Sequence, residues 1–335
     1  MKVLVTGATG FLGKATLSLL VSSDTFEQII VITRSKKTHP SEKVKVVKGD
    51  LTDPQCLKRV SDSIDAVIHI AGLYDFGKGY AENYLHNVVA TSQVVAWIKN
   101  LPRPVPIHFI STYAVGAGRW SSHEPEGLQK TLPEESRHYA FSKSMAEHSI
   151  ARSGLPYVIY RPGIIVGDSV QGKFENLNGP YYILKLLSNL NRSGLLAKLP
   201  AVPIPAHRDA FLPLVPVDLV AQVIAEGVKD QNNHLNKVYG IYDESSTTCA
   251  AFMDAVKAHW GLNFRPVFVQ EFPRRLLRLQ RHLTKIPPEV FLFANEVRSL
   301  SNPIFLSDFP NHRIPTFETY KEVFFEGFER MNGVF

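Results

Sequence analysis

The chain has 335 residues, which is enough for one large domain or for a main domain with a smaller one. Hydrophobic residues make up 44% and charged residues 20%, without a low-complexity tract, so the composition excludes a disordered protein. The net charge of +6 favours an anionic partner, but no nucleic-acid recognition motif accompanies it, and we expect no nucleic-acid binding.

The cysteines and the apolar segments narrow the class of protein further. Cys56 and Cys249 stand far apart and lack the spacing of a zinc site, so we expect neither a disulfide framework nor a metal centre. The first residues run directly into glycines without the apolar region of a signal peptide. No run of about 18 apolar residues could span a bilayer. We therefore expect a cytoplasmic protein.

Short β-rich runs alternate with helix-length segments through the first two thirds of the chain. The expected strands are Lys2–Thr6, Ile29–Thr33, Val44–Lys48, Ala66–Ile70, Ile107–Ser111 and Tyr157–Tyr160. The expected helices start at Gly10 or cover Leu57–Val60, Ala81–Asn100 and Tyr139–Arg152. This alternation predicts an α/β fold of the Rossmann type, with a doubly wound parallel sheet.

Glycine, asparagine and proline punctuation becomes dense after Gly163, and the regular alternation stops. We predict a Rossmann domain over residues 1–166, to which 213–237 return, and a smaller, discontinuous substrate-binding cap formed by 167–212 and 238–335. Arginines alternate with leucines in 274–285, which reads either as a solvated surface helix or as a basic amphipathic helix in weak contact with a membrane. Homodimer formation is left open.

Three glycines follow the first expected strand and open a helix. In this setting Gly7 permits a tight turn, Gly10 lets the backbone approach a pyrophosphate, and Gly13 lets the helix pack on the strand. We therefore expect a dinucleotide to bind at the residues Gly7, Thr9, Gly10, Phe11, Leu12 and Gly13.

The residue after the second expected strand indicates which dinucleotide binds. An Asp or Glu usually holds the ribose hydroxyls of NAD there, but this chain has Arg34. A guanidinium can bind the 2′-phosphate of NADP in a bidentate manner, whereas a carboxylate would repel it. Arg34 therefore predicts NADP(H), and a merely solvated arginine is the alternative.

Tyr139 and Lys143 stand four residues apart, which places their Cβ atoms about 6 Å apart on one helix face. A nearby ammonium can lower the pKa of a phenol, so that the tyrosine exchanges a proton with a carbonyl or alcohol oxygen. Tyr74–Lys78 and Tyr181–Lys185 repeat the spacing, but neither falls on a helix between two core strands. Tyr139 and Lys143 are thus the predicted proton-transfer pair.

A hydroxyl at the end of the Ile107–Ser111 strand could complete this site, because it would hydrogen-bond the substrate oxygen and share its developing charge. Ser111 and Thr112 both qualify.

The glycine spacing and the Tyr-x-x-x-Lys helix resemble those of the short-chain dehydrogenase/reductase superfamily. The resemblance implies that Thr112 is the catalytic hydroxyl, with Ser111 as the alternative, and that Lys143 also binds the nicotinamide ribose. It further implies cofactor contacts at Asp50, Leu51, Ala71, Gly72, Pro162 and Gly163. Asn87 lies in a stretch similar to a family motif, but we interpret it as an amide that braces its helix.

Further stretches at 70–75, 167–172, 179–182, 214–218 and 314–320 resemble the fatty-acyl and thioester reductase-like branch of the extended short-chain reductases. This likeness implies NADPH-dependent reduction of a hydrophobic acyl thioester, aldehyde or ketone, with the acyl group delivered on coenzyme A or a carrier. Tyr181 and Tyr182 would then line the substrate pocket.

Three alternatives stay open for the function. Two are enzymes of the same fold: a sterol- or flavonoid-type alcohol dehydrogenase, and an NAD-dependent sugar-nucleotide epimerase or dehydratase. The third is a catalytically idle scaffold that senses NADP.

Overall fold

The computed structural model describes residues 1–35, 38–60, 63–74, 78–115, 137–245, 247–269 and 301–333. The chain forms two compact units. Unit 1 comprises Met1–Pro162, Val217–Ile241 and Ser301–Arg313, and unit 2 comprises Gly163–Pro216, Tyr242–Leu300 and Ile314–Phe335.

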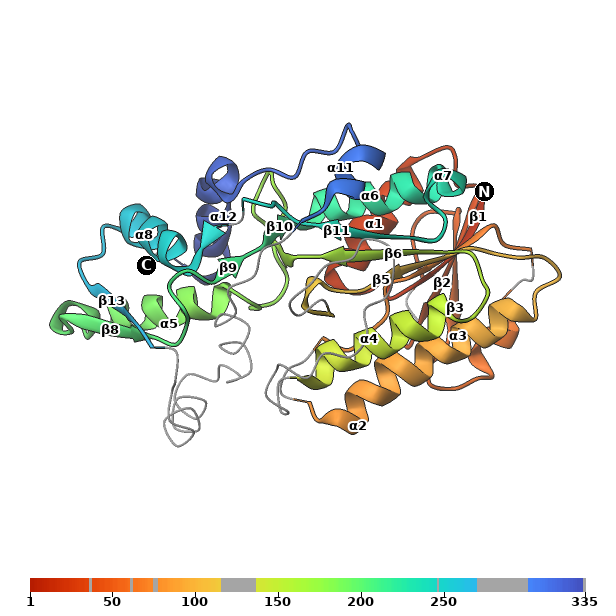
Figure 1. Cartoon of the computed structure of the whole chain (residues 1–335), viewed down its shortest axis with the longest axis horizontal. Coiled ribbons are helices and arrows are strands. Elements are labelled where there is room, and N and C mark those ends of the chain that lie inside the picture. The colour runs from red at the N-terminus through yellow and green to blue at the C-terminus, as the bar shows by residue number, and fades with distance from the viewer. Residues whose placement is uncertain are drawn as a thin grey trace. The chain divides into compact units, whose positions relative to one another are not determined.

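A seven-stranded sheet forms the centre of unit 1 (Figure 1). Its strands are β1 (Lys2–Thr6), β2 (Gln28–Thr33), β3 (Val44–Lys48), β4 (Ala66–His69), β5 (Ile107–Ile110), β6 (Tyr157–Pro162) and β11 (Lys237–Ile241). They are arranged in the order β11-β6-β5-β4-β1-β2-β3, and every pairing is parallel. Strands covered on both faces read as apolar runs, as Val3, Leu4 and Val5 do. The predicted fold class is confirmed.

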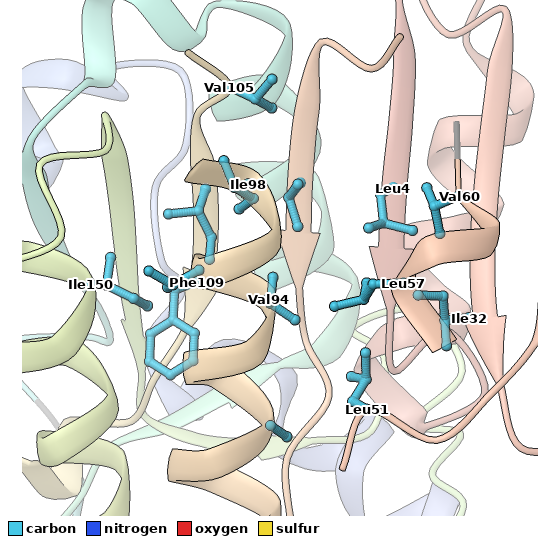
Figure 2. Close-up of a cluster of buried hydrophobic side chains, with 14 of the residues drawn as sticks. Leu4, Ile32, Leu51, Leu57, Val60, Val94, Ile98, Val105, Phe109 and Ile150 are labelled. Carbon is cyan, nitrogen blue, oxygen red and sulfur yellow. The ribbon is translucent and has the colours of Figure 1, made fainter. Parts of the chain in front are cut away.

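Helices cover both faces of this sheet. Helices α1 (Phe11–Ser22) and α6 (Val217–Lys229) pack together on one face, and α3 (Ala90–Lys99) and α4 (Arg137–Ala151) lie on the other (Figure 1). Figure 2 shows aliphatic side chains and Phe109 in the cluster beneath the second pair, with Val94 and Ile98 from α3 and Ile150 from α4. These three side chains are almost completely buried, which explains why the apolar residues of α3 and α4 recur at helical spacing.

Shorter elements complete unit 1: η1 (Cys56–Arg59), α2 (Tyr80–Asn83), η2 (Tyr84–Val89), η3 (Tyr113–Val115), α7 (Gln231–His234) and α11 (Pro303–Asp308). The segment η2 is one π-helical stretch that joins α2 to α3, so the helix expected over Ala81–Asn100 is present with a local widening. Such widenings are often found at functional sites.

The boundary between the units differs from the predicted one. Strand β11 pairs with β6, and α11 contacts β11, so residues 238–241 and 301–313 belong to unit 1 rather than to a cap. Conversely, β7 (Ile164–Val166) pairs with β10 (Leu214–Pro216), and both belong to unit 2. Single aromatic side chains attach the segment 301–313 to the rest of unit 1. Phe305 and Phe309 are fully buried, and Phe309 stacks on His234 of α7 with ring centroids 4.4 Å apart.

Unit 2 is built from short strands and amphipathic helices. Besides β7 and β10 it contains β8 (Ala201–Ile204) paired with β13 (Arg265–Phe268), β9 (Phe211–Leu212) paired with β12 (Thr247–Thr248), η4 (Leu196–Lys198), α5 (Tyr181–Arg192), α8 (Cys249–Trp260) and α12 (Phe317–Asn332). Aromatic rings fill its core, where Phe324 stacks on Tyr181 with centroids 4.9 Å apart. At Gly172, which has a φ of +64°, a Cβ would lie 2.1 Å from a carbonyl oxygen of α12, so only glycine fits there.

Across the described ranges, no helix is both long and apolar enough to cross a bilayer. The segment 274–285, considered above as a membrane-contacting helix, lies outside the described residues.

Candidate active site

The predicted dinucleotide loop lies where the strand order of the sheet reverses, between β1 and β4. Open α/β sheets bind ligands at this point, beyond the carboxyl ends of the strands. The two strand ends are in close contact: a Cβ added to Gly7 would lie 2.5 Å from the backbone nitrogen of Ala71. Gly7 also has a φ of +74°, so the turn after β1 requires glycine for two reasons.

The three motif glycines have different surroundings. A Cβ on Gly13 would lie 2.0 Å from the carbonyl oxygen of Gly7, so the packing of α1 against the loop requires glycine there. A Cβ on Gly10 would meet only that same oxygen, at the ordinary contact distance of 3.4 Å. The protein's own packing therefore does not require glycine at position 10, whereas a dinucleotide approaching the backbone would.

The start of α1 also suits a pyrophosphate. Gly10 is the N-cap residue and makes no side-chain capping bond, and the first turn carries no acidic residue. Thr9 and Gly10 are exposed, Phe11 is half-buried, and Leu12 and Gly13 are buried. The uncapped N–H groups and the helix dipole thus present a positive end beside exposed backbone, so this chain fits a dinucleotide cofactor.

Arg34 is exposed directly after β2, beside the half-buried Ser35. Asp50 lies near it, because the Arg34 charge contributes to a lowered pKa of the Asp50 carboxyl, after hydrogen bonds from Thr52. The Asp50 carboxylate accepts from the Thr52 backbone nitrogen and hydroxyl, both at 2.9 Å, and Leu51 between them is buried. Arginine and aspartate thus occupy neighbouring positions after β2 and β3.

Tyr139 lies in the first turn of α4 and is 9% exposed. Burial raises the pKa of its phenol, and a hydrogen bond with the Thr112 side chain acts in the opposite direction. Thr112 follows β5 and also accepts a bond from the Ala114 backbone nitrogen at 3.3 Å. Within the described residues, the buried Ser111 hydroxyl has no hydrogen-bond partner. Of the two candidate hydroxyls, Thr112 is the one bonded to the tyrosine.

Lys143 is 4% exposed, one turn beyond Tyr139. Its ammonium donates to the carbonyl oxygen of Ile110 at 2.5 Å and lies 4.2 Å from the centre of the Phe109 ring. Burial lowers the pKa of Lys143 to about 7, while the Glu147 charge acts in the opposite direction.

The expected lowering of the Tyr139 pKa by Lys143 is therefore not found. The lysine ammonium is directed to the end of β5, and burial dominates the pKa of the phenol.

Asn87, in the π-helical segment, holds the backbone that follows β4. Its amide accepts from the Leu73 nitrogen at 2.6 Å, donates to the Leu73 oxygen at 3.2 Å, and donates to the Ser142 hydroxyl of α4 at 2.9 Å. A Cβ on Gly72 would lie 3.0 Å from the Asn87 oxygen and 3.6 Å from the Lys143 nitrogen. Gly72 thus lies beside the lysine, Ala71 lies beside Gly7, and Asn87 braces more than its own helix.

Two features were missed by the sequence analysis. The ring of Tyr74 packs edge-on against Tyr139, with centroids 5.2 Å apart, although Tyr74 belongs to a Tyr-x-x-x-Lys pair that was set aside. The second is an ion pair between Glu147 and Arg161, both fully buried. Glu147 stands four residues after Lys143, and that spacing was the available signal.

The remaining predicted residues have mixed surroundings. Pro162 is buried at the end of β6, and a Cβ on Gly163 would lie 2.0 Å from the Pro213 oxygen, so close packing within unit 2 already requires that glycine. Tyr181 is 1% exposed, its hydroxyl accepts from the Gly167 nitrogen at 2.9 Å, and its ring stacks on Phe174. Tyr181 is therefore a core residue of unit 2 rather than a pocket wall. Tyr182 is half-buried, and its substrate role stays a prediction.

The sequence profile of a family described as "Male sterility protein" matches residues 5–44 and 38–224. Among curated proteins, the hybrid PKS-NRPS synthetase pydA of Acremonium sp is 32% identical over 244 residues, which are 68% of this chain and 6% of that protein. The curated relatives are much longer proteins, and the chain spans 5 to 7% of their length.

Two solved structures share the fold over nearly the whole chain. The terminal R domain from the myxalamid PKS-NRPS biosynthetic pathway has a TM-score of 0.75 and 22% identity, covering 99% of this chain and 91% of that one. A thiolation-reductase di-domain from an archaeal non-ribosomal peptide synthetase has a TM-score of 0.70 and 20% identity, covering 99% and 75%. At these identities the likeness establishes the fold.

Proposed function

The chain belongs to the male sterility protein family, in the thioester reductase-like branch of the extended short-chain dehydrogenases/reductases, and from this premise we propose that it is an NADP(H)-dependent oxidoreductase acting on a hydrophobic acyl thioester or the corresponding aldehyde. The relatives make a reductase of carrier-linked acyl groups the leading candidate within the family. The acyl group would be attached to coenzyme A or to a carrier protein.

One observation carries the proposal: Tyr139 is hydrogen-bonded to Thr112 where β5 ends, and Lys143 donates to Ile110 at that same strand end. The Tyr139 phenol, the Thr112 hydroxyl and the Lys143 ammonium therefore lie at the carboxyl end of β5. The glycine loop follows the carboxyl end of β1 in the same parallel sheet. In the Tyr181–Lys185 segment, by contrast, the tyrosine hydroxyl accepts from the Gly167 backbone nitrogen and the lysine donates to Asn332.

The chain supplies proton transfer and charge stabilisation. The reduced cofactor, when bound at Gly7–Gly13, supplies the hydride. Tyr139 donates the proton to the carbonyl oxygen as that oxygen gains charge, and the Thr112 hydroxyl shares the charge through a hydrogen bond. With a thioester, the carbon then carries the new hydroxyl and the sulfur; the hydroxyl loses its proton as the carbon–sulfur bond breaks, the sulfur gains a proton, and a thiol and an aldehyde result. Lys143, in its charged form, would make the Tyr139 proton easier to release and would hold the nicotinamide ribose.

Arg34 supports NADP(H) as the cofactor. Arg34 is exposed beyond β2, where the adenosine ribose lies in this fold, and the half-buried Ser35 follows it in the chain. Nearby Asp50 is already engaged by Thr52, which leaves the arginine as the group suited to a 2′-phosphate.

We propose that Tyr74, rather than Tyr181, contacts the substrate next to Tyr139. Its ring contacts Tyr139, yet 45% of its surface is exposed, so part of the ring is available to an apolar chain next to the reacting carbonyl.

The proposal is tested by following NADPH oxidation with purified protein. The substrates are long-chain acyl-CoAs, acyl groups on a carrier protein, aldehydes, steroid ketones and UDP-sugars. Turnover of thioesters or aldehydes is expected. Turnover confined to the steroid ketones would instead favour the alcohol dehydrogenase alternative. Conversion of UDP-sugars without NADPH oxidation, detected by product analysis, would favour the epimerase.

The choice of cofactor has its own test. Replacing Arg34 with alanine should weaken NADPH binding by about 10- to 100-fold, the effect of losing a charge-assisted hydrogen bond, and should leave NADH binding unchanged. Fluorescence titration of both nucleotides measures this. Equal losses for the two nucleotides would show that Arg34 does not read the 2′-phosphate.

A further inference from the structure

A buried ion pair lies one turn beyond Lys143 on α4. Arg161, on β6, donates to the two carboxylate oxygens of Glu147 from its Nε at 3.0 Å and its Nη2 at 2.6 Å. Both side chains are 0% exposed. Tyr139, Lys143 and Glu147 follow one another at intervals of four residues, so they share one face of α4.

Stability alone is a weak reason for such a pair. Removing two charges from water costs several kcal/mol per ion in general, and buried ion pairs are often no more stabilising than apolar residues of the same volume. Removing one partner, by contrast, leaves a buried charge without compensation. A role beyond stability is therefore worth seeking for Glu147 and Arg161.

The surroundings of Lys143 suggest that role. Its ammonium faces the Ile110 carbonyl, the Phe109 ring and His69, whose pKa burial lowers to about 3, so this histidine is neutral. Tyr139 on the same helix is also neutral, because burial raises its pKa. Among the described residues around Lys143, Glu147 is the charged group that favours the ammonium form. Its negative charge raises the pKa of Lys143, whereas burial lowers it.

We propose that Glu147, fixed by its two hydrogen bonds from Arg161, is a positioning residue that holds Lys143 in its charged form next to Tyr139. The catalytic meaning of this charge rests on the oxidoreductase function proposed above. Its physical consequence does not, because the protonation of Lys143 can be followed in the protein without cofactor.

The sign of the consequence follows from linkage. The pKa of Lys143 is about 7 in the folded chain and 10.5 in the unfolded chain, so between these values the unfolded state binds more protons. Stability should therefore rise with pH across this window through Lys143. Without Glu147 the folded pKa drops further, and the rise should begin about 1 pH unit lower or more, the usual effect of losing one close opposite charge.

Three variants test this. Glu147→Gln removes the charge with little change of shape, but it takes a carboxylate partner away from the buried Arg161 and could prevent folding. The double variant Glu147→Leu/Arg161→Met removes both charges and keeps an apolar, packed site. Glu147→Asp keeps the charge and serves as the conservative control. Lys143→Met is made in the wild-type and double-variant backgrounds, so that the pH effect can be assigned to Lys143.

Unfolding by urea is measured from pH 5 to 10, together with NADPH affinity by fluorescence and the pH profile of kcat/KM. In the double variant, three features should move to lower pH: the rise of stability, the loss of NADPH affinity and the basic limb of the kcat/KM profile. In Glu147→Asp all three should stay near their wild-type pH values. Wild-type pH dependence in a folded double variant would overturn the proposal. If the wild-type protein binds no NADPH, the proposed function fails, and the unfolding measurement still decides the role of Glu147.

Discussion

Helices α4 and α5 carry the same Tyr-x-x-x-Lys spacing in different units, and the two pairs have different partners. In α4, Tyr139 is bonded to Thr112 and Lys143 donates to Ile110, both at the end of β5. In α5, the Tyr181 hydroxyl accepts from a backbone nitrogen, and its ring stacks on Phe174 with centroids 3.9 Å apart. Lys185 donates to the side chain of Asn332.

The difference shows what the spacing does and does not specify. It places two side chains on one helix face, and both tyrosines are buried with raised pKa values. In α4 that face meets the end of β5, where the Thr112 hydroxyl and the Ile110 carbonyl are available. In α5 the Tyr181 hydroxyl meets the backbone nitrogen of Gly167, which follows the parallel strand β7. The second hydroxyl and the carbonyl acceptor therefore distinguish a candidate reactive tyrosine from a packing one.

The largest expected effect separates the two tyrosines by activity. Tyr139→Phe should lower turnover by about 10²- to 10⁴-fold, the usual contribution of a general acid, with little loss of stability. Tyr181→Phe, the matched control, removes one hydrogen bond to Gly167 and should keep turnover. Rates of NADPH oxidation at saturating substrate measure the effect. A Tyr139→Phe protein with full turnover would remove the proposed acid.

Replacement of Tyr181, unlike that of the tyrosines at the candidate site, should mainly lower the stability of the protein. Tyr181→Ala removes a ring stacked on Phe174 and Phe324 and should cost about 3–5 kcal/mol of unfolding free energy, the usual range for deleting a buried aromatic side chain. Tyr74→Ala, which removes a ring that is 45% exposed, provides the comparison and should cost much less. Urea denaturation measures both. A Tyr181→Ala protein of wild-type stability would reopen a substrate role for this residue.

The parallel sheet of unit 1 could be predicted because buried strands read as apolar runs and their turns carry glycine. The expected runs Lys2–Thr6 and Val44–Lys48 match β1 and β3 residue for residue. The limits of unit 1 could not be predicted in the same way. Strand β11 and the segment 301–313 join unit 1 through pairing with β6 and through single aromatic contacts such as Phe309 on His234, which leave no periodic pattern.

The candidate site was predictable to the extent that its parts are local in sequence. The glycine loop and the Tyr139–Lys143 helix each lie within a few residues, so spacing identifies them. The contacts of Tyr74 with Tyr139 and of Arg161 with Glu147 join separate elements, and only the fold brings them together. The pKa of Tyr139 was wrongly expected to fall because burial, which dominates it, cannot be read from spacing.

Gly10 and Gly13 are a second pair of identical residues with different surroundings, and their replacement should have smaller effects. Gly13→Ala would place a Cβ 2.0 Å from the Gly7 oxygen and should cost about 1–3 kcal/mol of stability through overpacking. Gly10→Ala meets no such clash and should fold normally, but it should weaken NADPH binding by about tenfold because its methyl group lies where the pyrophosphate approaches. Urea denaturation and fluorescence titration of both variants measure the two effects. Normal NADPH affinity in Gly10→Ala would show that the cofactor does not approach the loop at this residue.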